Sequence, residues 1–342
     1  MSEKSIGLDI GLTNIKAVSL SRRKEGFFLN SVFSMPTPAR GMFSESPLDQ
    51  EALSQAIKKV VSNLKVDTRN INVALDDNQV YTKVIDMPVL SDKELSLAIH
   101  WEAEQNIPVS LSEITLVWSV LKKPPKDGGV EKMQVLLVGA PTALVSKYQK
   151  VISSSGLILS SIETEILAIV RVLSYSGLPP TIILSIGAIS TSLAIVKDNI
   201  LVFTYSIQTG GNAISRAIAA DFGLTMAQSE EYKKAYGFSR EGVGQKIGKS
   251  TELILNSLVA EAKKAIAFYS QKYKDDSIIQ QILLSGGTAR LPGIDLFFAE
   301  NLGIETVLAN PWKILASQVV PQEIVGSSSD FTIAVGLAMR DL

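Results

Sequence analysis

The sequence contains no cysteine and a single histidine, His100, among its 342 residues. Without cysteine there is no disulfide bond and no thiolate metal site, and the composition is compatible with a reducing compartment such as the cytosol. One histidine nearly excludes histidine-based catalysis and histidine metal clusters, so we expect a structural role for His100. The chemistry of the protein must therefore depend on carboxylates, lysines, hydroxyls and backbone groups.

Excess charge and long apolar runs are also missing. The chain has 33 basic and 34 acidic residues, so no overall field attracts nucleic acid or an anionic membrane. No apolar run reaches the roughly 20 residues that span a bilayer, and the start, MSEKSIGLDI, does not have the pattern of a signal peptide. We therefore expect a soluble protein without direct membrane insertion, and one that can still dock on a membrane partner.

Strand and helix patterns alternate along both halves of the chain, which is typical of α/β layering. The first half opens with strands over 5–34, followed by an amphipathic helix over 51–64. A strand, helix, strand, strand, helix unit over about 78–157 follows as an insertion. Its first helix starts at Ser91 with a capping box, and the turn PPKDGG joins its last two strands.

The second half restarts with strands over 181–207, which form a hairpin at the turn KDN. Residues 278–287 are expected to form a buried strand that ends in glycines. The predicted helices of this half cover ISRAIAADF, MAQSEEYKKAYG, residues 251–273, Pro292 to Gly303, and residues 330–342.

Residues 8–16, LDIGLTNIK, form a glycine turn between two apolar strands. Gly11 allows backbone amides to approach a phosphate, and Lys16 supplies a point charge. Thr13 and Asn14 add short donors, and Asp9 is expected to hold Mg²⁺ through water. For one such loop, hairpin geometry alone is an equally good explanation.

The stretch LSIGAISTS, residues 184–192, repeats this loop about half a chain later. It and two further glycine elements, QTGGN and LLSGGTARLPG, follow expected strands, where open α/β folds bind ligands. The residues that these loops add to the predicted site are Gly187, Ser190, Gly210, Gly211, Asn212, Gly286, Gly287 and Thr288. The two hairpins and a third loop, SGGTARLPG, can together enclose one nucleotide.

The order and character of these loops resemble the superfamily of actin, sugar kinases and heat-shock chaperones, in which two duplicated halves enclose ATP. The resemblance implies that the paired hairpins are phosphate loops and that SGGTARLPG is the adenosine loop. The fold class expected is α/β, as an actin-like duplicated two-domain fold with an inserted strand-helix-strand-strand subdomain.

Several longer segments narrow the resemblance: WEAEQNIPVSLSEITLVWSVL, MQVLLVGAPTALVSKYQKVISSSGL, SIETEILAIVR, GGNAISRAIA, SEEYKK and AVGLAMR. From about residue 5 to the end, the chain resembles the type IV pilus assembly protein PilM family, which is related to the division protein FtsA. In that family a cytoplasmic protein binds ATP and the N-terminal tail of the inner-membrane protein PilN. The implied subdomains are IA (1–77 and 158–180), IC (78–157), IIA (181–209 and 279–324), IIB (210–278) and a C-terminal helix (325–342) that returns to IA.

The resemblance also implies roles for residues outside the glycine loops. Glu230 and Lys233 are expected to face the adenine and ribose, and Glu165 is the candidate for positioning the attacking water. The partner tail is expected in a groove between IA and IC, with ATP or ADP and Mg²⁺ as cofactors. Other pilus platform proteins, assembly ATPases and a homo-oligomer or ring are further candidate partners.

Two positions depart from the family pattern. Leu12 replaces a serine of the first loop, which costs little because the backbone amide does the binding. Ser185 replaces an aspartate of the second loop, so hydrolysis is expected to be weak or absent while binding remains. Two alternatives stay open: an FtsA-like polymerising scaffold, and a small-molecule kinase of the same superfamily.

Overall fold

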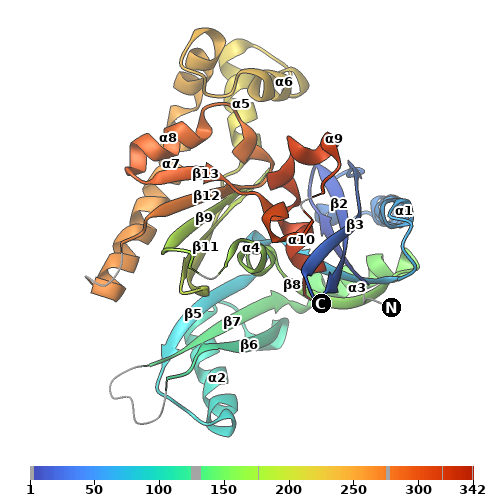
Figure 1. Cartoon of the computed structure of the whole chain (residues 1–342), viewed down its shortest axis with the longest axis vertical. Coiled ribbons are helices and arrows are strands. Elements are labelled where there is room, and N and C mark those ends of the chain that lie inside the picture. The colour runs from blue at the N-terminus through green and yellow to red at the C-terminus, as the bar shows by residue number, and fades with distance from the viewer. Residues whose placement is uncertain (1–3, 125–131, 176, 275–277, 318, 341) are drawn as a thin grey trace.

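The computed structural model describes residues 4–124, 132–175, 177–274, 278–317, 319–340 and 342. Within these residues, two five-stranded sheets lie next to each other and a three-stranded sheet extends from one end (Figure 1). The arrangement confirms the predicted α/β class. Apart from Pro124, the predicted turn PPKDGG lies outside the described residues.

The first sheet has the strand order β3-β2-β1-β4-β8. Its strands are β1 (Lys4–Ile10), β2 (Asn14–Arg23), β3 (Gly26–Pro36), β4 (Asn70–Leu75) and β8 (Ile158–Thr164). The first three form the predicted antiparallel meander, whereas β4 pairs parallel with β1 and β8 pairs parallel with β4. Because parallel strands end at the same edge, the segments that follow β1 and β4 are neighbours.

The second sheet repeats this order as β11-β10-β9-β12-β13. Its strands are β9 (Thr181–Ile186), β10 (Thr191–Lys197), β11 (Ile200–Ile207), β12 (Gln281–Ser285) and β13 (Glu305–Leu308). The KDN hairpin is confirmed: Asp198 and Asn199 have φ of +52° and +62°, as the tight turn that matches strand twist requires. The fold is thus a duplication at the level of topology.

Two helices, α4 (Glu165–Leu173) and α10 (Thr332–Ala338), fill the space between the sheets. They approach each other and β1 closely because glycine occupies the contacts. A Cβ on Gly336 would lie 1.9 Å from the carbonyl oxygen of Ala168, and one on Gly7 2.0 Å from that of Ala334. No larger residue fits at either position without moving a helix.

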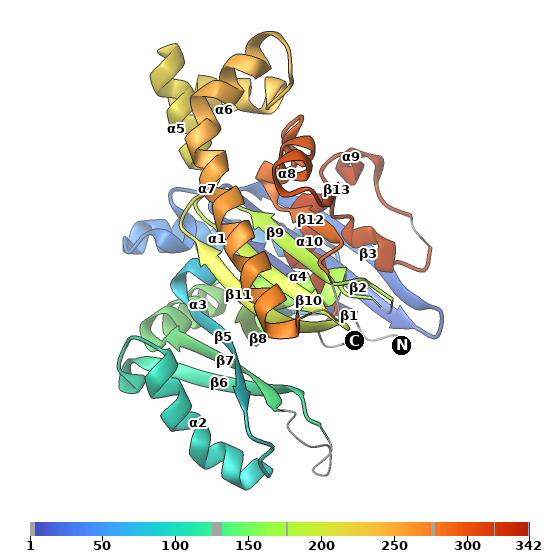
Figure 2. The ribbon, with the colours of Figure 1, turned by 90° about the vertical axis from the view of Figure 1, so that its left-hand side faces the viewer.

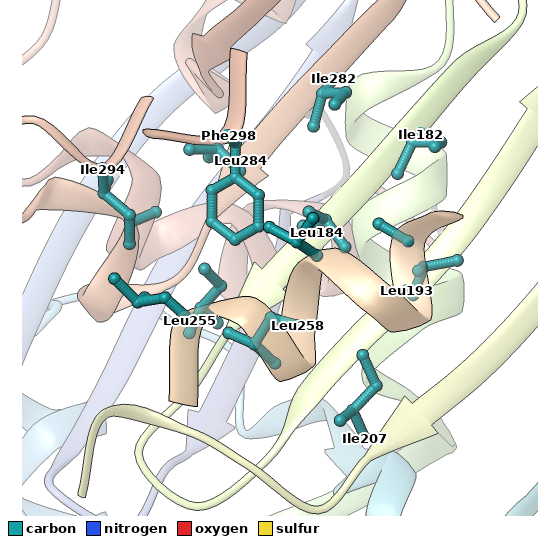
Figure 3. Packing of buried hydrophobic residues seen from close by; sticks show 14 of the residues in the cluster. Ile182, Leu184, Leu193, Ile207, Leu255, Leu258, Ile282, Leu284, Ile294 and Phe298 are labelled. Carbon is teal, nitrogen blue, oxygen red and sulfur yellow. The ribbon is translucent and has the colours of Figure 1, made fainter. Parts of the chain in front are cut away.

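The outer helices cover the far faces of the sheets. Helices α1 (Pro47–Asn63) and α3 (Thr142–Ser154) pack on the first sheet. Helices α7 (Gly242–Tyr273) and α8 (Ile294–Leu302) pack on the second sheet, whereas α5 (Gly211–Phe222) and α6 (Met226–Tyr236) pack on each other and on α7 beyond one end of this sheet (Figure 1). Figure 2 shows α7 running across this sheet, and Figure 3 shows its Leu255 and Leu258 close to strand residues and to Phe298 of α8.

Two predicted helix starts were wrong. Helix α7 begins at Gly242 rather than at residue 251, so it includes a glycine-containing first section. Helix α8 begins at Ile294 after the left-handed cap Gly293, and Pro292 lies before that cap. Its predicted end at Gly303 is confirmed as a left-handed C-cap.

The inserted sheet has the order β5-β7-β6 and carries one helix. Its elements are β5 (Tyr81–Met87), α2 (Asp92–Asn106), β6 (Ile114–Lys122) and β7 (Met133–Pro141). The predicted capping box is confirmed: the Glu94 carboxylate accepts from the Ser91 amide at 2.8 Å, and the Ser91 hydroxyl oxygen accepts from the Glu94 amide. This layer has a core of its own between α2 and the sheet.

Contacts of the inserted sheet reach the second half. Lys272 of α7 lies 2.8 Å from Asp86 of β5, and Gln134 of β7 donates to the Tyr273 hydroxyl at 3.0 Å. Helix α3, which we expected in the insertion, instead buries Val151 against α1 and the first sheet. The exact subdomain boundaries therefore remain predictions. The chain ends with α9 (Gln322–Val325) and α10.

Candidate functional site

The two glycine loops adopt the same turn. In β1–β2 the Gly11 amide donates to the Asn14 carbonyl at 3.1 Å, and in β9–β10 the Gly187 amide donates to the Ser190 carbonyl at 2.9 Å. Equivalent residues of the two copies thus make equivalent backbone bonds. The sequence repeat is a structural repeat.

Both turns open onto one cavity of about 590 Å³ between the halves. This volume is in the range of ligand pockets. Of the predicted site residues it is lined by Asp9, Gly11, Leu12, Thr13, Asn14, Lys16, Glu165, Gly187, Ser190, Gly211, Asn212, Glu230, Lys233, Gly286, Gly287 and Thr288. Gly210 lies behind the wall, where a Cβ would come within 2.7 Å of the Gly187 carbonyl oxygen, so its glycine lets α5 approach the second hairpin.

The first hairpin places an ion pair in the cavity. Asp9 and Lys16 are direct cross-strand partners, and their Oδ2 and Nζ atoms lie 3.0 Å apart. Burial opposes the charge on Lys16, but the carboxylates of Asp9, Asp330 and Glu165 raise its pKa above the ordinary value. Lys16 therefore stays charged, and Asp9 holds it by one of its three donors.

The second hairpin has no charge at the corresponding positions. Ser185 faces Ser192 across β9 and β10, as Asp9 faces Lys16. The Ser192 hydroxyl donates to the Asp77 carboxylate at 2.6 Å. The acid that contacts this hairpin thus comes from the first half of the chain.

Glu165 is the first residue of α4 and lines the cavity. Burial raises its pKa well above the ordinary value, and the nearby carboxylates of Asp76, Asp77 and Asp9 add to this effect. These surroundings favour the neutral form of Glu165, in which the carboxyl group can donate a hydrogen bond.

The opposite end of the cavity contains a second ion pair. Lys233 is 4% exposed; its Nζ lies 2.6 Å from Glu230 and donates to the Gly211 carbonyl at 3.1 Å and the Ser215 hydroxyl at 2.9 Å. These contacts use its three donors. Burial lowers the pKa of Lys233, which the Glu230 carboxylate opposes. Lys233 thus holds the start of α5, while Glu230, with its side chain 35% exposed, stays accessible.

Some cavity residues were missed by the sequence analysis. Asp76 lines the wall near Ser190, and Arg290 and Asp330 form an ion pair of 2.9 Å beside the third loop. The signal for Asp76 was available: the pair of acids in NINVALDD directly follows a buried strand that runs parallel to β1. Arg290 lies within SGGTARLPG, the expected adenosine loop, whereas no local sequence pattern marks Asp330.

The acidic side chains of the cavity determine whether a metal ion can bind. Among the residues that the structure describes, no group of three or more His, Cys, Asp or Glu side chains is arranged to hold a metal. Asp9 is a buried carboxylate next to the turn of the first hairpin. Such a donor fits an Mg²⁺ ion that keeps most of its water ligands and is also held by phosphate oxygens.

Two halves of matching topology with a shared cavity between them define an actin-like two-domain fold. A family model described as type IV pilus assembly protein PilM matches residues 7–342. The chain belongs to the type IV pilus assembly protein PilM family. The predicted fold and family are therefore confirmed.

The chain is also similar to individual proteins. A solved structure described as the PilM-PilN type IV pilus biogenesis complex superposes with a TM-score of 0.85 at 25% identity, over 99% of each chain. MreB5 of Spiroplasma citri bound to AMPPNP gives a TM-score of 0.57 at 14% identity, over 100% of this chain and 96% of that one. The cell division protein FtsA of Enterococcus hirae is 22% identical over 344 residues, which cover 90% of this chain and 78% of FtsA. In the part of the chain that the structure describes, no helix is long and apolar enough to cross a membrane.

Proposed function

We propose that this protein is a cytoplasmic ATP-binding scaffold of the type IV pilus inner-membrane platform, which binds the N-terminal tail of a PilN-like membrane protein. Nucleotide binding is supported by one observation: both hairpin turns and the third glycine loop, SGGTARLPG, line the same cavity. Binding of a PilN-like tail is supported by the 25% identical relative whose structure is described as a PilM-PilN complex.

In this proposal the two hairpins hold the phosphates of ATP or ADP. The backbone of Gly11 and Gly187 and the free donors of Lys16 face the phosphates, and Glu230 faces the ribose and adenine. Mg²⁺ would neutralise phosphate charge, with Asp9 contacting it through water. MreB5, which shares the fold, was solved with AMPPNP.

Hydrolysis is expected to be weak or absent. Ser185 provides no carboxylate near the phosphates, and the surroundings of Glu165 favour its protonated form, which cannot accept a proton from water. The site is thus better suited to binding a nucleotide than to turning it over. Binding of ATP or ADP would then shift the equilibrium between conformations that differ in how the two halves are arranged.

A second cavity of about 610 Å³ is the candidate site for the partner tail. It lies where the first half meets the inserted sheet, between Phe43, the start of α1 and the first turns of α3. Leu144 and Phe43 provide apolar surface, and Lys147 pairs with Glu45 at 2.6 Å. Phe43 also lines the first cavity, so the two candidate sites share a wall.

The nucleotide part is tested with nucleotide-free protein, Mg-ATP and a thermal melt. A ligand at about 100 times its Kd stabilises the native state by roughly 2.7 kcal/mol. A melting temperature unchanged by saturating Mg-ATP, with no heat in a calorimetric titration, contradicts nucleotide binding. Co-purification with the products of neighbouring genes tests for a single-span partner.

An FtsA-like polymer is the second candidate, because FtsA proteins are 22% identical over 90% of this chain. Electron microscopy and sedimentation with ATP distinguish the two functions. Filaments formed by the protein alone favour the polymer, whereas a one-to-one complex with the tail peptide favours the scaffold. A ring with other platform proteins or assembly ATPases would be seen in the same experiments.

A further inference from the structure

Asp77 joins the two halves of the molecule through a single buried side chain. It is the second residue after β4 and is 7% exposed. Its Oδ1 accepts from the Ile166 amide of α4 at 3.2 Å, and its Oδ2 accepts from the Ser192 hydroxyl of β10 at 2.6 Å. Both oxygens are thus bonded to groups outside the turn in which Asp77 lies.

Each partner of Asp77 is attached to a cavity residue. Ile166 follows Glu165, the first residue of α4. Ser192 lies two positions after Ser190 and opposite Ser185 on the neighbouring strand. Asp77 therefore lies behind the cavity wall at the point where α4 of one half meets the hairpin of the other.

The two hairpins differ in how they are held. The first carries its own ion pair, Asp9 with Lys16, whereas the second has serines at both corresponding positions. Its Ser192 uses the carboxylate of Asp77 instead. The second hairpin therefore depends on a carboxyl group of the other half for this hydrogen bond.

The electrostatic cost of burying the Asp77 carboxylate also suggests that this residue has a function. Burial raises its pKa to about 7, with a further contribution from Asp76, while the hydrogen bonds from Ser192 and the Ile166 amide oppose the shift. A neutral residue of similar shape would avoid the cost of burying this charge. Perturbed carboxyl groups that bridge elements beside a cavity are often retained for function.

We propose that Asp77 is a positioning residue, which through Ser192 holds the second hairpin in place against the first turn of α4 and so sets Ser190 and Glu165 around the ligand. The ligand role rests on the proposed nucleotide function. The link between the halves rests on the two hydrogen bonds alone.

The test compares Asp77→Ala, Ser192→Ala and the double variant by calorimetric titration with Mg-ATP. Each single variant should weaken binding about 10-fold, and the double variant should be no weaker than Asp77→Ala, because the bond between Asp77 and Ser192 is absent from all three. Asp77→Asn should keep most of the affinity, because its amide oxygen can accept from the Ile166 amide and its amide nitrogen can donate to the Ser192 hydroxyl. The matched control is Asp86→Ala, which breaks another contact between the halves, with Lys272, away from the cavity.

Hydrogen exchange of the ligand-free protein gives a readout that does not need nucleotide. Both Asp77→Ala and Ser192→Ala should increase exchange in residues 165–169 and 188–192, and Asp86→Ala should not. Additive losses of affinity, or unchanged exchange in folded variants, overturn the proposal. If the wild type binds no nucleotide but exchange rises as expected, the nucleotide function fails and the link stands.

Discussion

The Nζ atom of Lys16 lies 3.0 Å from Oδ2 of Asp9, its direct partner across the first hairpin, and the same register of the second hairpin joins Ser185 to Ser192. The duplicated loops thus keep their backbone turn and differ in charge. A phosphate that contacts both loops meets a cation on one side and neutral groups on the other. The two loops should therefore contribute unequally to binding.

Lys16→Ala should weaken nucleotide binding more than Ser185→Ala. A charge-assisted contact is worth about 1.5 to 3 kcal/mol, or roughly 10- to 150-fold in affinity, whereas a neutral hydrogen bond is worth about 0.5 to 1.5 kcal/mol. Lys16→Ala also leaves the buried Asp9 without its ion-pair partner, which adds repulsion toward phosphate. Titration calorimetry measures both variants, with Lys58→Ala on the exposed face of α1 as the control. Similar losses for Lys16→Ala and Ser185→Ala would mean that the loops have been assigned wrongly.

The pH dependence of stability should reveal the buried carboxyl of Asp77. Its folded pKa of about 7 lies above the unfolded value of about 3.9, so the folded state binds more protons between these values. The free energy of unfolding should therefore fall as pH rises from about 4 to 7 and level off above 7, by up to roughly 4 kcal/mol from this group. Urea denaturation at several pH values measures this.

In Asp77→Asn the fall in stability should be smaller. Asp76 and Glu165, whose pKa values are also raised, face the same region together with Asp9 and Lys16, so some dependence on pH remains. The variant should equal or exceed the wild type in stability at pH 8. The same decline in both proteins would show that Asp77 keeps an ordinary pKa.

The hairpins could be predicted from sequence because their signals are local. Alternating strands on both sides of a glycine turn, and Asp-Asn in the KDN turn, specify a hairpin within about ten residues. The role of Asp77 could not be predicted in this way. Its two partners, Ile166 and Ser192, lie 89 and 115 positions away and are brought together by parallel pairing and by the contact between halves.

The start of α7 shows a second limit of prediction from the sequence. Gly242, Gly244 and Gly248 lower helix propensity, so the sequence pattern favoured a later start. In the structure a Cβ on Gly244 would lie 1.9 Å from the Ser239 hydroxyl. Glycine is required there by close packing, a tertiary effect that overrides local propensity.

Glu163→Gln should destabilise the fold strongly. The Glu163 side chain is 2% exposed and forms ion pairs with Arg171 at 2.5 Å and with Arg340, which follows α10. Removing the charge of Glu163 weakens its bonds to two arginines whose side chains are 28% and 36% exposed and so remain partly hydrated, at a cost of about 1.5 to 3 kcal/mol. Urea denaturation should show a lower midpoint with an unchanged slope. Glu261→Gln, on an exposed pair with Lys264, is the control and should change stability by less than about 1 kcal/mol.

Leu144→Glu should abolish binding of the partner tail while leaving nucleotide binding intact. Leu144 lines the second cavity on the face of α3 next to Lys147, and a carboxylate there would put charge where an apolar peptide side chain is expected. Deleting the whole insertion is a poorer test, because α3 also buries Val151 and Ile152 in the first half. A point variant keeps Val151 and Ile152 in place and changes only Leu144, which packs at the margin of that core.

The measurement is a fluorescence titration with a labelled peptide of the PilN-like tail. Leu97→Glu on α2 is the matched control, since Leu97 is 70% exposed on the inserted layer and does not line the cavity. We expect a loss of at least about 30-fold for Leu144→Glu, in line with placing a charge in an apolar contact, and no change for Leu97→Glu. Equal binding by both variants, each with the melting temperature of the wild type, would move the tail to another surface. Loss with Leu97→Glu alone would identify α2 of the inserted layer as that surface.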